Sequence, residues 1–216
     1  MINLINEDCL KVMKKMKDKS VDISFTSPPY NRKRNDKYKN YNDTIKDYFK
    51  FLIDFTDELL RLTKKYVFIN LQKNYYNKQD VFNYIGKYSD KIVEIIIWEK
   101  TNPMPASGFN ITNSYEMFIV LSNEPLKSNN TYTKNVITTS VNSDTTTKIH
   151  KAVMKQEVSD WFIKKFTKEN NLILDCFMGL GTTGISCKKL NRNFIGIEIN
   201  EEYFNIAKER IENMEV

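Results

Sequence analysis

The chain has 216 residues, of which 41% are hydrophobic and 28% are charged, so it is long enough for one sizeable domain with a small inserted region. Three cysteines and a single histidine, His150, argue against a disulfide framework and a multi-histidine metal site, and we expect no metal. The net charge of +6 favours a polyanionic partner. Because no apolar run approaches about 20 residues and the opening lacks a signal pattern, we expect a cytoplasmic protein without a membrane partner.

Short β-branched runs alternate with longer amphipathic stretches, which predicts an α/β fold built on a parallel sheet. The runs predict seven strands, at residues 2–5, 21–25, 66–70, 92–98, 115–121, 171–175 and 193–199. The amphipathic stretches predict helices at residues 9–16, 45–63, 75–88, 157–166, 182–190 and 201–213, the last of them capped by Asn200. Two polar segments, 31–44 and 122–149, interrupt this alternation, and such segments are usually functional or disordered.

The strand expected at 21–25 ends in "TSPPY", which comprises Thr26, Ser27, Pro28, Pro29 and Tyr30. Prolines stop a strand, because they lack a ladder donor and fix the backbone. Rigid carbonyls and a hydroxyl are acceptors suited to an amine, and an aromatic ring suits a planar base. The pattern predicts a socket for the exocyclic amine of a nucleobase. The structural alternative is an ordinary strand-ending turn, because Ser-Pro-Pro is common in loops.

A second motif lies near the end of the chain, where an apolar strand ends at Asp175 and a glycine loop and a helix follow. Gly179 and Gly181 let the backbone bend sharply and approach a ligand closely. Glu198 lies at the tip of the next strand, about 20 residues on, where an acid can accept both hydroxyls of a ribose. The loop lacks a Walker motif and the third glycine of the dinucleotide fingerprint, so we expect a nucleoside with a modest tail. The alternative is a tight turn whose glycines serve packing.

Together these segments resemble the amino-methyltransferases of DNA that use S-adenosylmethionine. "TSPPY" is similar to their catalytic motif, Ser/Asp/Asn-Pro-Pro-aromatic, and "DCFMGLGTT" is similar to their cofactor loop, Asp-Pro-Phe-x-Gly-Ser-Gly-Thr-Thr. Cys176 and Leu180 replace the usual proline and serine of that loop, and "HKAVMKQEV", from His150, matches a family segment less well. The resemblance covers nearly the whole chain except 31–44 and 122–149.

The motif order, circularly permuted with the catalytic corner first, is that of the β group of these enzymes. This resemblance implies a Rossmann-like methyltransferase fold, with a seven-stranded, mostly parallel sheet and helices on both faces. The strand at 115–121 should run antiparallel. Residues 1–216 would form a single methyltransferase domain, in which 122–149 is a small inserted target-recognition region. The basic loop at 31–40 falls where the family contacts DNA.

The resemblance also implies roles for individual residues. In the cofactor-binding set, Glu198 would hold the ribose hydroxyls and Asp8 would lie at the adenine end. The methionine part of the cofactor would be surrounded by Asp175, Phe177, Gly179, Gly181 and Thr182. The catalytic set holds the target base and comprises Ser27, Pro28 with its carbonyl, Pro29 and Tyr30. Because a target amine lies inside the duplex, its base must be flipped out.

The implied function is site-specific methylation of double-stranded DNA by direct transfer from S-adenosylmethionine. Serine in the first motif position accompanies cytosine N4 more often than adenine N6, so we expect N4-methylcytosine, with N6-methyladenine as the alternative. An RNA or protein-glutamine N-methyltransferase and a non-catalytic nucleic-acid-binding protein are less favoured readings of the same motifs. By resemblance a homodimer is expected, and a cognate restriction endonuclease acting separately is left open.

Overall fold

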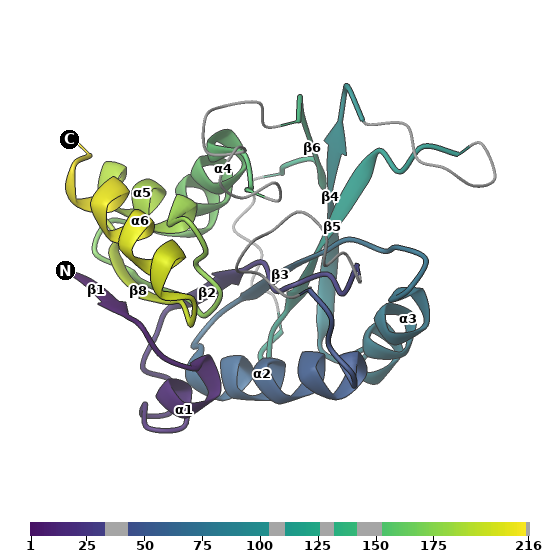
Figure 1. Ribbon diagram of the computed structural model, residues 1–216, viewed down its shortest axis with the longest axis horizontal. Helices are drawn as coiled ribbons and strands as arrows, with labels where there is room; N and C mark the ends of the chain where they lie inside the picture. Colours follow the sequence, from purple (N-terminus) through teal and green to yellow (C-terminus); the bar gives the residue numbers. More distant parts are fainter. Residues whose placement is uncertain (33–42, 104–110, 126–131, 142–152, 215–216) are drawn as a thin grey trace.

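The computed structural model describes residues 1–32, 43–103, 111–125, 132–141 and 153–214. Within these ranges, eight strands form one sheet in the order β1-β8-β7-β2-β3-β5-β4-β6 (Figure 1). Every strand pair is parallel except the two that involve β5, which runs antiparallel to β3 and β4 as predicted. The strands are β1 (Ile2–Ile5), β2 (Ile23–Thr26), β3 (Val67–Leu71), β4 (Ile92–Lys100), β5 (Tyr115–Leu121), β6 (Val136–Thr139), β7 (Leu172–Asp175) and β8 (Asn193–Ile197).

The prediction of seven strands was wrong, because β6 lies inside the polar segment 122–149. This short edge strand pairs in parallel with the last residues of β4. The indole of Trp98 donates a hydrogen bond of 2.8 Å to the Thr139 hydroxyl, and Ile137 packs against the core. A four-residue strand set among Ser, Thr and Asn has no hydrophobic periodicity strong enough to reveal it.

Helices cover both faces of the sheet, as predicted. The helices α1 (Cys9–Met13), α2 (Tyr48–Leu62) and α3 (Lys78–Lys87) pack on one face, and α4 (Gln156–Phe166), α5 (Thr182–Lys189) and α6 (Glu201–Glu212) pack on the other (Figure 1). Each interface has its own buried apolar cluster. In the second cluster, the rings of Phe118 and Phe162 have centroids 4.2 Å apart and planes tilted by 41°, so the two rings are in close contact. Among the described residues, no helix combines the length and apolarity needed to cross a membrane.

Polar side chains set where several helices begin. The Asn200 carboxamide accepts a hydrogen bond of 3.1 Å from the Tyr203 amide, so it caps α6 as predicted. Helix α3 begins at Lys78, later than predicted, because side chains of a polar turn hold the preceding backbone. In that turn, Asn74 Oδ1 accepts from the Tyr76 amide at 2.8 Å, and the Asn77 carboxamide accepts from the Asn74 amide at 2.7 Å.

The order in which the chain adds strands to the sheet reverses between the neighbouring strands β7 and β2. From β7 the strand order runs outward through β8 to β1, and from β2 it runs the other way through β3. At the carboxyl ends of these central strands, Thr26 Oγ1 donates a hydrogen bond of 2.7 Å to Asp175 Oδ1. Ligands of open α/β sheets bind outside the carboxyl ends of the strands at such a switch point.

Candidate active site

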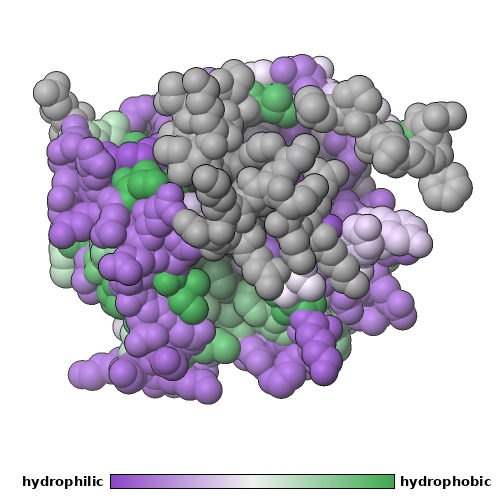
Figure 2. All heavy atoms as spheres, viewed as in Figure 1, coloured by the Kyte–Doolittle hydropathy of each residue, from purple (hydrophilic) through white to green (hydrophobic). Residues whose placement is uncertain are grey.

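One cavity of about 560 Å³ joins the two motifs that lie far apart in the sequence. Ser27 lines it from the loop after β2, Gly179 from the loop after β7, and Glu198 from the tip of β8. Its volume lies within the roughly 300–1,000 Å³ of small-molecule sites. Of the predicted site residues, Ser27, Pro28, Pro29, Tyr30, Asp8, Asp175, Phe177, Gly179, Thr182 and Glu198 line the cavity. The face of the molecule in Figure 2 is hollowed near its centre, where apolar side chains show between polar margins.

The two positions of the loop require glycine for different physical reasons. Both have a positive φ, of 51° at Gly179 and 81° at Gly181, which side chains rarely tolerate. A Cβ at Gly179 would meet nothing within 4 Å, so the backbone there borders open space. A Cβ at Gly181 would lie 3.0 Å from Ile211 Cδ1, because this residue packs against α6 instead of lining the cavity. Gly179 therefore allows close approach of a ligand, whereas Gly181 allows close packing.

Asp175 lies at the centre of the switch point, almost fully buried. Its Oδ1 accepts hydrogen bonds from Thr26 Oγ1 at 2.7 Å and from the Phe177 amide at 3.1 Å, and its Oδ2 accepts from Thr183 Oγ1 at 2.6 Å. Burial raises the pKa of this carboxyl to about 6, although the three hydrogen bonds oppose the shift. A cationic ligand beside Asp175 would favour the ionised form and lower that pKa again.

Glu198 ties the tip of β8 to the glycine loop. Its Oε2 accepts a hydrogen bond of 3.0 Å from the Gly179 amide, and its Oε1 accepts one of 2.9 Å from the Asn200 amide. The Ile199 amide is a further backbone donor to this carboxylate, which still keeps acceptor capacity for a hydroxyl group of a ligand. Burial raises the pKa of Glu198, and its backbone hydrogen bonds oppose that shift.

The other predicted cofactor residues form the walls of the cavity. Asp8 lines the cavity, and its carboxylate also accepts a hydrogen bond of 3.0 Å from the Lys11 amide at the start of α1. The Phe177 ring packs against Phe51 and Phe55 of α2, with centroid distances of 5.6 Å and 5.0 Å. Thr182 opens α5. The lining of the site therefore combines aromatic and acidic side chains.

The residues that depart from the family loop are both buried. The Cys176 thiol lies 3.7 Å from Thr26 Oγ1, and Leu180 is in the interior. Burial raises the pKa of Cys176 well above 9, so it remains a thiol and behaves as a small apolar side chain. In this loop, Gly179 and Gly181 both adopt left-handed conformations beside the two departing residues.

The carbonyls of the two-proline corner differ in their partners. Tyr48 donates a hydrogen bond of 2.8 Å to the Pro29 carbonyl. The Tyr30 carbonyl accepts two, from Asn74 Nδ2 at 2.8 Å and from Asn77 Nδ2 at 2.7 Å. Within the described part of the chain, no donor reaches the Pro28 carbonyl. These hydrogen bonds hold the backbone of the corner in place. The Pro28 carbonyl, next to Ser27, keeps its capacity to accept a hydrogen bond.

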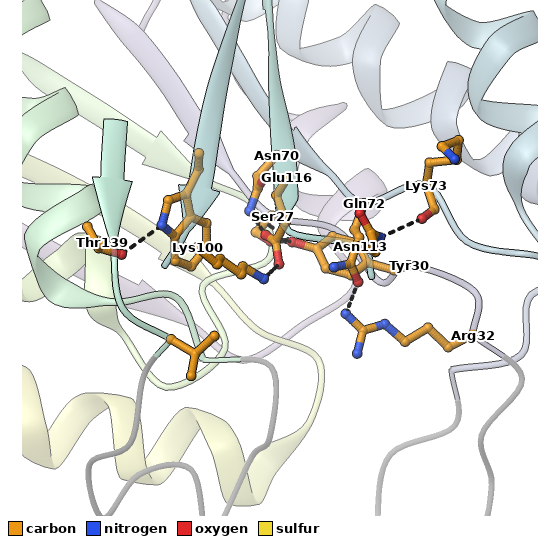
Figure 3. A network of polar contacts seen from close by, with 12 residues as sticks. Ser27, Tyr30, Arg32, Asn70, Gln72, Lys73, Lys100, Asn113, Glu116 and Thr139 are labelled. Atoms are coloured by element: carbon orange, nitrogen blue, oxygen red, sulfur yellow. Dashed lines mark hydrogen bonds and ion pairs between the residues drawn. The ribbon is translucent and has the colours of Figure 1, made fainter. Parts of the chain in front are cut away.

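Tyr30 lies deeper than a simple stacking platform would. Only 7% of it is exposed, and the Arg32 guanidinium lies over its ring at 5.2 Å from the centroid. Its hydroxyl contacts Ser27 Oγ at 3.0 Å, Glu116 Oε2 at 2.9 Å and Asn70 Nδ2 at 2.8 Å (Figure 3). Stacking of a base on the face that Arg32 covers would require this guanidinium to move.

Two residues in or beside the site were not predicted from the sequence. Asp43 lies in the polar segment 31–44 but is buried, and it accepts hydrogen bonds of 2.8 Å from the amides of Asn31 and Arg32. It lines the cavity, and burial raises its pKa. Glu116 was also missed, because it is a single acid within the apolar run of β5. An acid in an otherwise buried strand is the one signal that could have marked it.

Some predicted regions lie outside the described residues. These are His150, most of the basic loop at 31–40, and residues 126–131 and 142–149 of the predicted target-recognition region. Arg32 is described, and its guanidinium pairs with the Gln72 side chain near the corner (Figure 3).

Comparisons with known proteins agree with this architecture. A family model described as DNA methylase, of the N6 and N4 type, matches residues 21–209. The type II methyltransferase M2.LlaDCHI of Lactococcus lactis subsp. cremoris is 29% identical over 96% of this chain and 88% of its own length. The type II methyltransferase M2.DpnII of Streptococcus pneumoniae is 26% identical over 97% of this chain and 89% of its own length.

Solved structures extend the likeness to the whole fold. The cytosine-N4-specific PvuII DNA methyltransferase superimposes with a TM-score of 0.81 at 17% identity, covering 99% of this chain and 88% of its own. M1.HpyAVI in complex with S-adenosylmethionine superimposes with a TM-score of 0.68 at 25% identity, covering 99% and 100%. The predicted Rossmann-like methyltransferase fold and S-adenosylmethionine as the cofactor are confirmed. The chain belongs to the N6/N4 DNA methylase family and is an S-adenosylmethionine-dependent amino-methyltransferase of DNA.

Proposed function

We propose that this enzyme methylates N4 of cytosine at a specific site in double-stranded DNA. The observation that carries the proposal is the single cavity lined by both Ser27 and Gly179. A neutral serine hydroxyl at the first position of the corner favours cytosine by family resemblance. The fold neighbour with the TM-score of 0.81 bears the name of a cytosine-N4-specific enzyme, which supports the same choice.

In this proposal the glycine loop and the acids hold S-adenosylmethionine. The open space at Gly179 fits a close approach of the methionine part, beside Asp175, Phe177 and Thr182. The acceptor capacity that Glu198 retains suits the ribose hydroxyls, and Asp8, which also lines the cavity, suits the adenine end. Gly181 serves by shaping the loop through its packing on α6.

The two-proline corner would hold the target amine. Ser27 Oγ and the Pro28 carbonyl are acceptors that the amine N–H groups can reach, because Pro29 and Tyr48 fix the backbone around them. Two such hydrogen bonds draw the nitrogen toward tetrahedral geometry, so its lone pair becomes available. The base must leave the duplex to reach this corner.

When bound, S-adenosylmethionine supplies an electrophilic methyl group, whose transfer breaks the carbon–sulfur bond, leaves the electron pair on sulfur and places the positive charge on the amine nitrogen. The enzyme contributes position and hydrogen bonds to that developing charge. Ser27 Oγ and the Pro28 carbonyl accept from the N–H groups as they become more acidic. One proton then departs to water, so the corner needs no strong base.

Adenine N6 is the second candidate, because the matching family model covers enzymes of both kinds. Nucleoside analysis of DNA treated with the enzyme separates the two. We expect N4-methyl-2′-deoxycytidine by mass spectrometry. N6-methyl-2′-deoxyadenosine as the sole product would overturn the choice of base while leaving the site intact.

The proposal extends to the partners of the enzyme. Residues 122–149 would read the target sequence, and the basic loop at 31–40 would contact DNA. A homodimer and a separately acting restriction endonuclease are proposals that rest on family resemblance. Sedimentation of the enzyme with and without a DNA duplex tests the dimer.

A further inference from the structure

A buried polar network lies behind the two-proline corner. Ser27 and Tyr30 line the cavity, whereas Asn70 of β3, Lys100 of β4 and Glu116 of β5 do not belong to its lining. The three strands are neighbours in the sheet, so Asn70 and Glu116 meet at the Tyr30 hydroxyl and Lys100 reaches Glu116 (Figure 3). Lys100 Nζ forms an ion pair with Glu116 Oε1. Glu116 Oε2 accepts hydrogen bonds from the Tyr30 hydroxyl and from Asn70 Nδ2.

The chemistry of the groups fixes the direction of every hydrogen bond in this network. An ionised carboxylate only accepts, so Tyr30 must donate its one proton to Glu116 Oε2, at 2.9 Å. Asn70 Nδ2 donates to the same carboxylate at 2.8 Å and to the Tyr30 hydroxyl at 2.8 Å. Since the phenol proton is already engaged, the 3.0 Å contact with Ser27 must use the serine proton.

This directionality reaches the cavity. With its own proton turned toward Tyr30, Ser27 Oγ presents only lone pairs to a ligand. Burial and the adjacent Glu116 carboxylate raise the pKa of Tyr30 well above 10, so the phenol keeps the proton that the arrangement requires. Ser27 Oγ is therefore an acceptor because of Glu116, to which it is linked only through the Tyr30 hydroxyl.

Stability alone is a weak reason for this arrangement. The Lys100 and Glu116 side chains are only 13% and 6% exposed, and the desolvation of such a pair offsets most of its attraction. The orientation also leaves Asn70 Oδ1 buried without a hydrogen-bond partner among the described residues. An apolar set of similar volume could fill the space at least as favourably.

We propose that Glu116 is a positioning residue for methyl transfer, which acts through Tyr30 to hold the Ser27 hydroxyl as a hydrogen-bond acceptor for the target amine. Lys100 and Asn70 hold the Glu116 carboxylate in place. The inference rests on the proposed role of Ser27, and it applies to cytosine and adenine alike.

The substitution Glu116→Gln tests the inference with little change of shape. Lys100 only donates, so the glutamine oxygen remains beside it and the amide NH2 faces Tyr30. The phenol then accepts from the amide, so its proton can turn toward Ser27 Oγ and occupy a lone pair there, and Asn70 Nδ2 loses the acceptor that it shared with Tyr30. We expect kcat to fall about 10- to 100-fold, as for other groups that orient a reacting residue, while the Kd for S-adenosylmethionine stays within about twofold.

A double-mutant cycle with Tyr30→Phe separates this role from a structural one. Tyr30→Phe disconnects Ser27 from Glu116, so adding Glu116→Gln to it should change kcat less than about twofold. The matched control is Glu94→Gln on β4, an exposed carboxylate that should leave kcat unchanged. Fully additive losses, or a Glu116→Gln enzyme with wild-type kcat, would overturn the inference.

Two further outcomes are informative. If Glu116→Gln does not fold, Tyr30→Phe alone decides, because wild-type kcat with that variant would overturn the inference, whereas a reduced kcat with unchanged cofactor affinity would support it. If the wild-type enzyme transfers no methyl group to any DNA, the proposed function fails. An active wild type with an equally active Glu116→Gln variant contradicts only the role of Glu116.

Discussion

Thr26 donates a hydrogen bond of 2.7 Å to Asp175 across 149 positions of sequence, and this contact joins the two halves of the site. Thr26 ends β2, directly before the two-proline corner, and Asp175 ends β7, directly before the glycine loop. The corner and the loop therefore lie together because their strands are neighbours in the sheet. Substitutions in either half should affect the same reaction.

The Ser27→Ala substitution removes the hydroxyl that would accept the target amine. We expect kcat to fall about 100-fold, the typical effect of removing one well-placed hydrogen bond to a developing charge. The Kd for S-adenosylmethionine, measured by calorimetry, should not change. The control is Ser89→Ala, an exposed position after α3. A Ser27→Ala enzyme with wild-type kcat would remove this serine from the mechanism.

Alanine at three glycines should give three different results. Gly86→Ala is in open space within α3 and should stabilise the fold by about 0.5–1 kcal/mol. Gly181→Ala meets α6 at 3.0 Å and should destabilise the fold by roughly 1–3 kcal/mol. Gly179→Ala should cost about 1–2 kcal/mol of backbone strain and also weaken binding of S-adenosylmethionine.

Thermal unfolding and calorimetry on the same three variants check this ordering. The cofactor effect should be largest at Gly179, because only there would the new methyl group enter the cavity. Equal loss of cofactor affinity in Gly179→Ala and Gly86→Ala would show that the loop does not contact the ligand.

Glu198→Ala should weaken cofactor binding about 10- to 100-fold, because the ribose loses a charged acceptor. The loop amide of Gly179 also loses its partner. Glu169→Ala, an exposed acid in the turn before β7, is the matched control and should bind normally. Unchanged affinity in Glu198→Ala would reassign the ribose site.

Asp175 gives the site a pH dependence. Burial raises its folded pKa from 3.8 to about 6, so its contribution to stability is fully present below about pH 4 and is lost as pH rises through 6. Above that pH the ionised, buried carboxylate disfavours the fold by about 2–3 kcal/mol. Asp175→Asn should therefore unfold at a temperature no lower than wild type at pH 8 and lose this pH dependence.

The same carboxylate should control cofactor affinity in the opposite sense. A cationic ligand binds best to ionised Asp175, so affinity for S-adenosylmethionine should fall as pH drops below 6 and be constant above 7. Calorimetry across pH 5–8 measures this directly. A pH-independent affinity in the wild type, or an Asp175→Asn variant that binds as tightly, would contradict the placement of the cofactor beside Asp175.

The sequence predicted the parts of this site that depend on local pattern. Prolines after a strand and glycines before a helix have local signatures, so Ser27 and Gly179 could be identified, and the parallel topology brings them together. Strand β6 and Asp43 could not be predicted, because each lies in a polar segment whose order comes from tertiary contacts. The pairing of Glu116 with Lys100 depends on the antiparallel register of β4 and β5, for which the sequence carries no signal.

A crystal structure of the enzyme with S-adenosylmethionine tests the central claim most directly. We expect the ribose hydroxyls at the Glu198 carboxylate, the methionine part along Gly179, and the sulfonium methyl group facing Ser27 Oγ across the cavity. Cofactor bound with its methyl group directed away from Ser27, or bound outside the space between Gly179 and Glu198, would contradict the account.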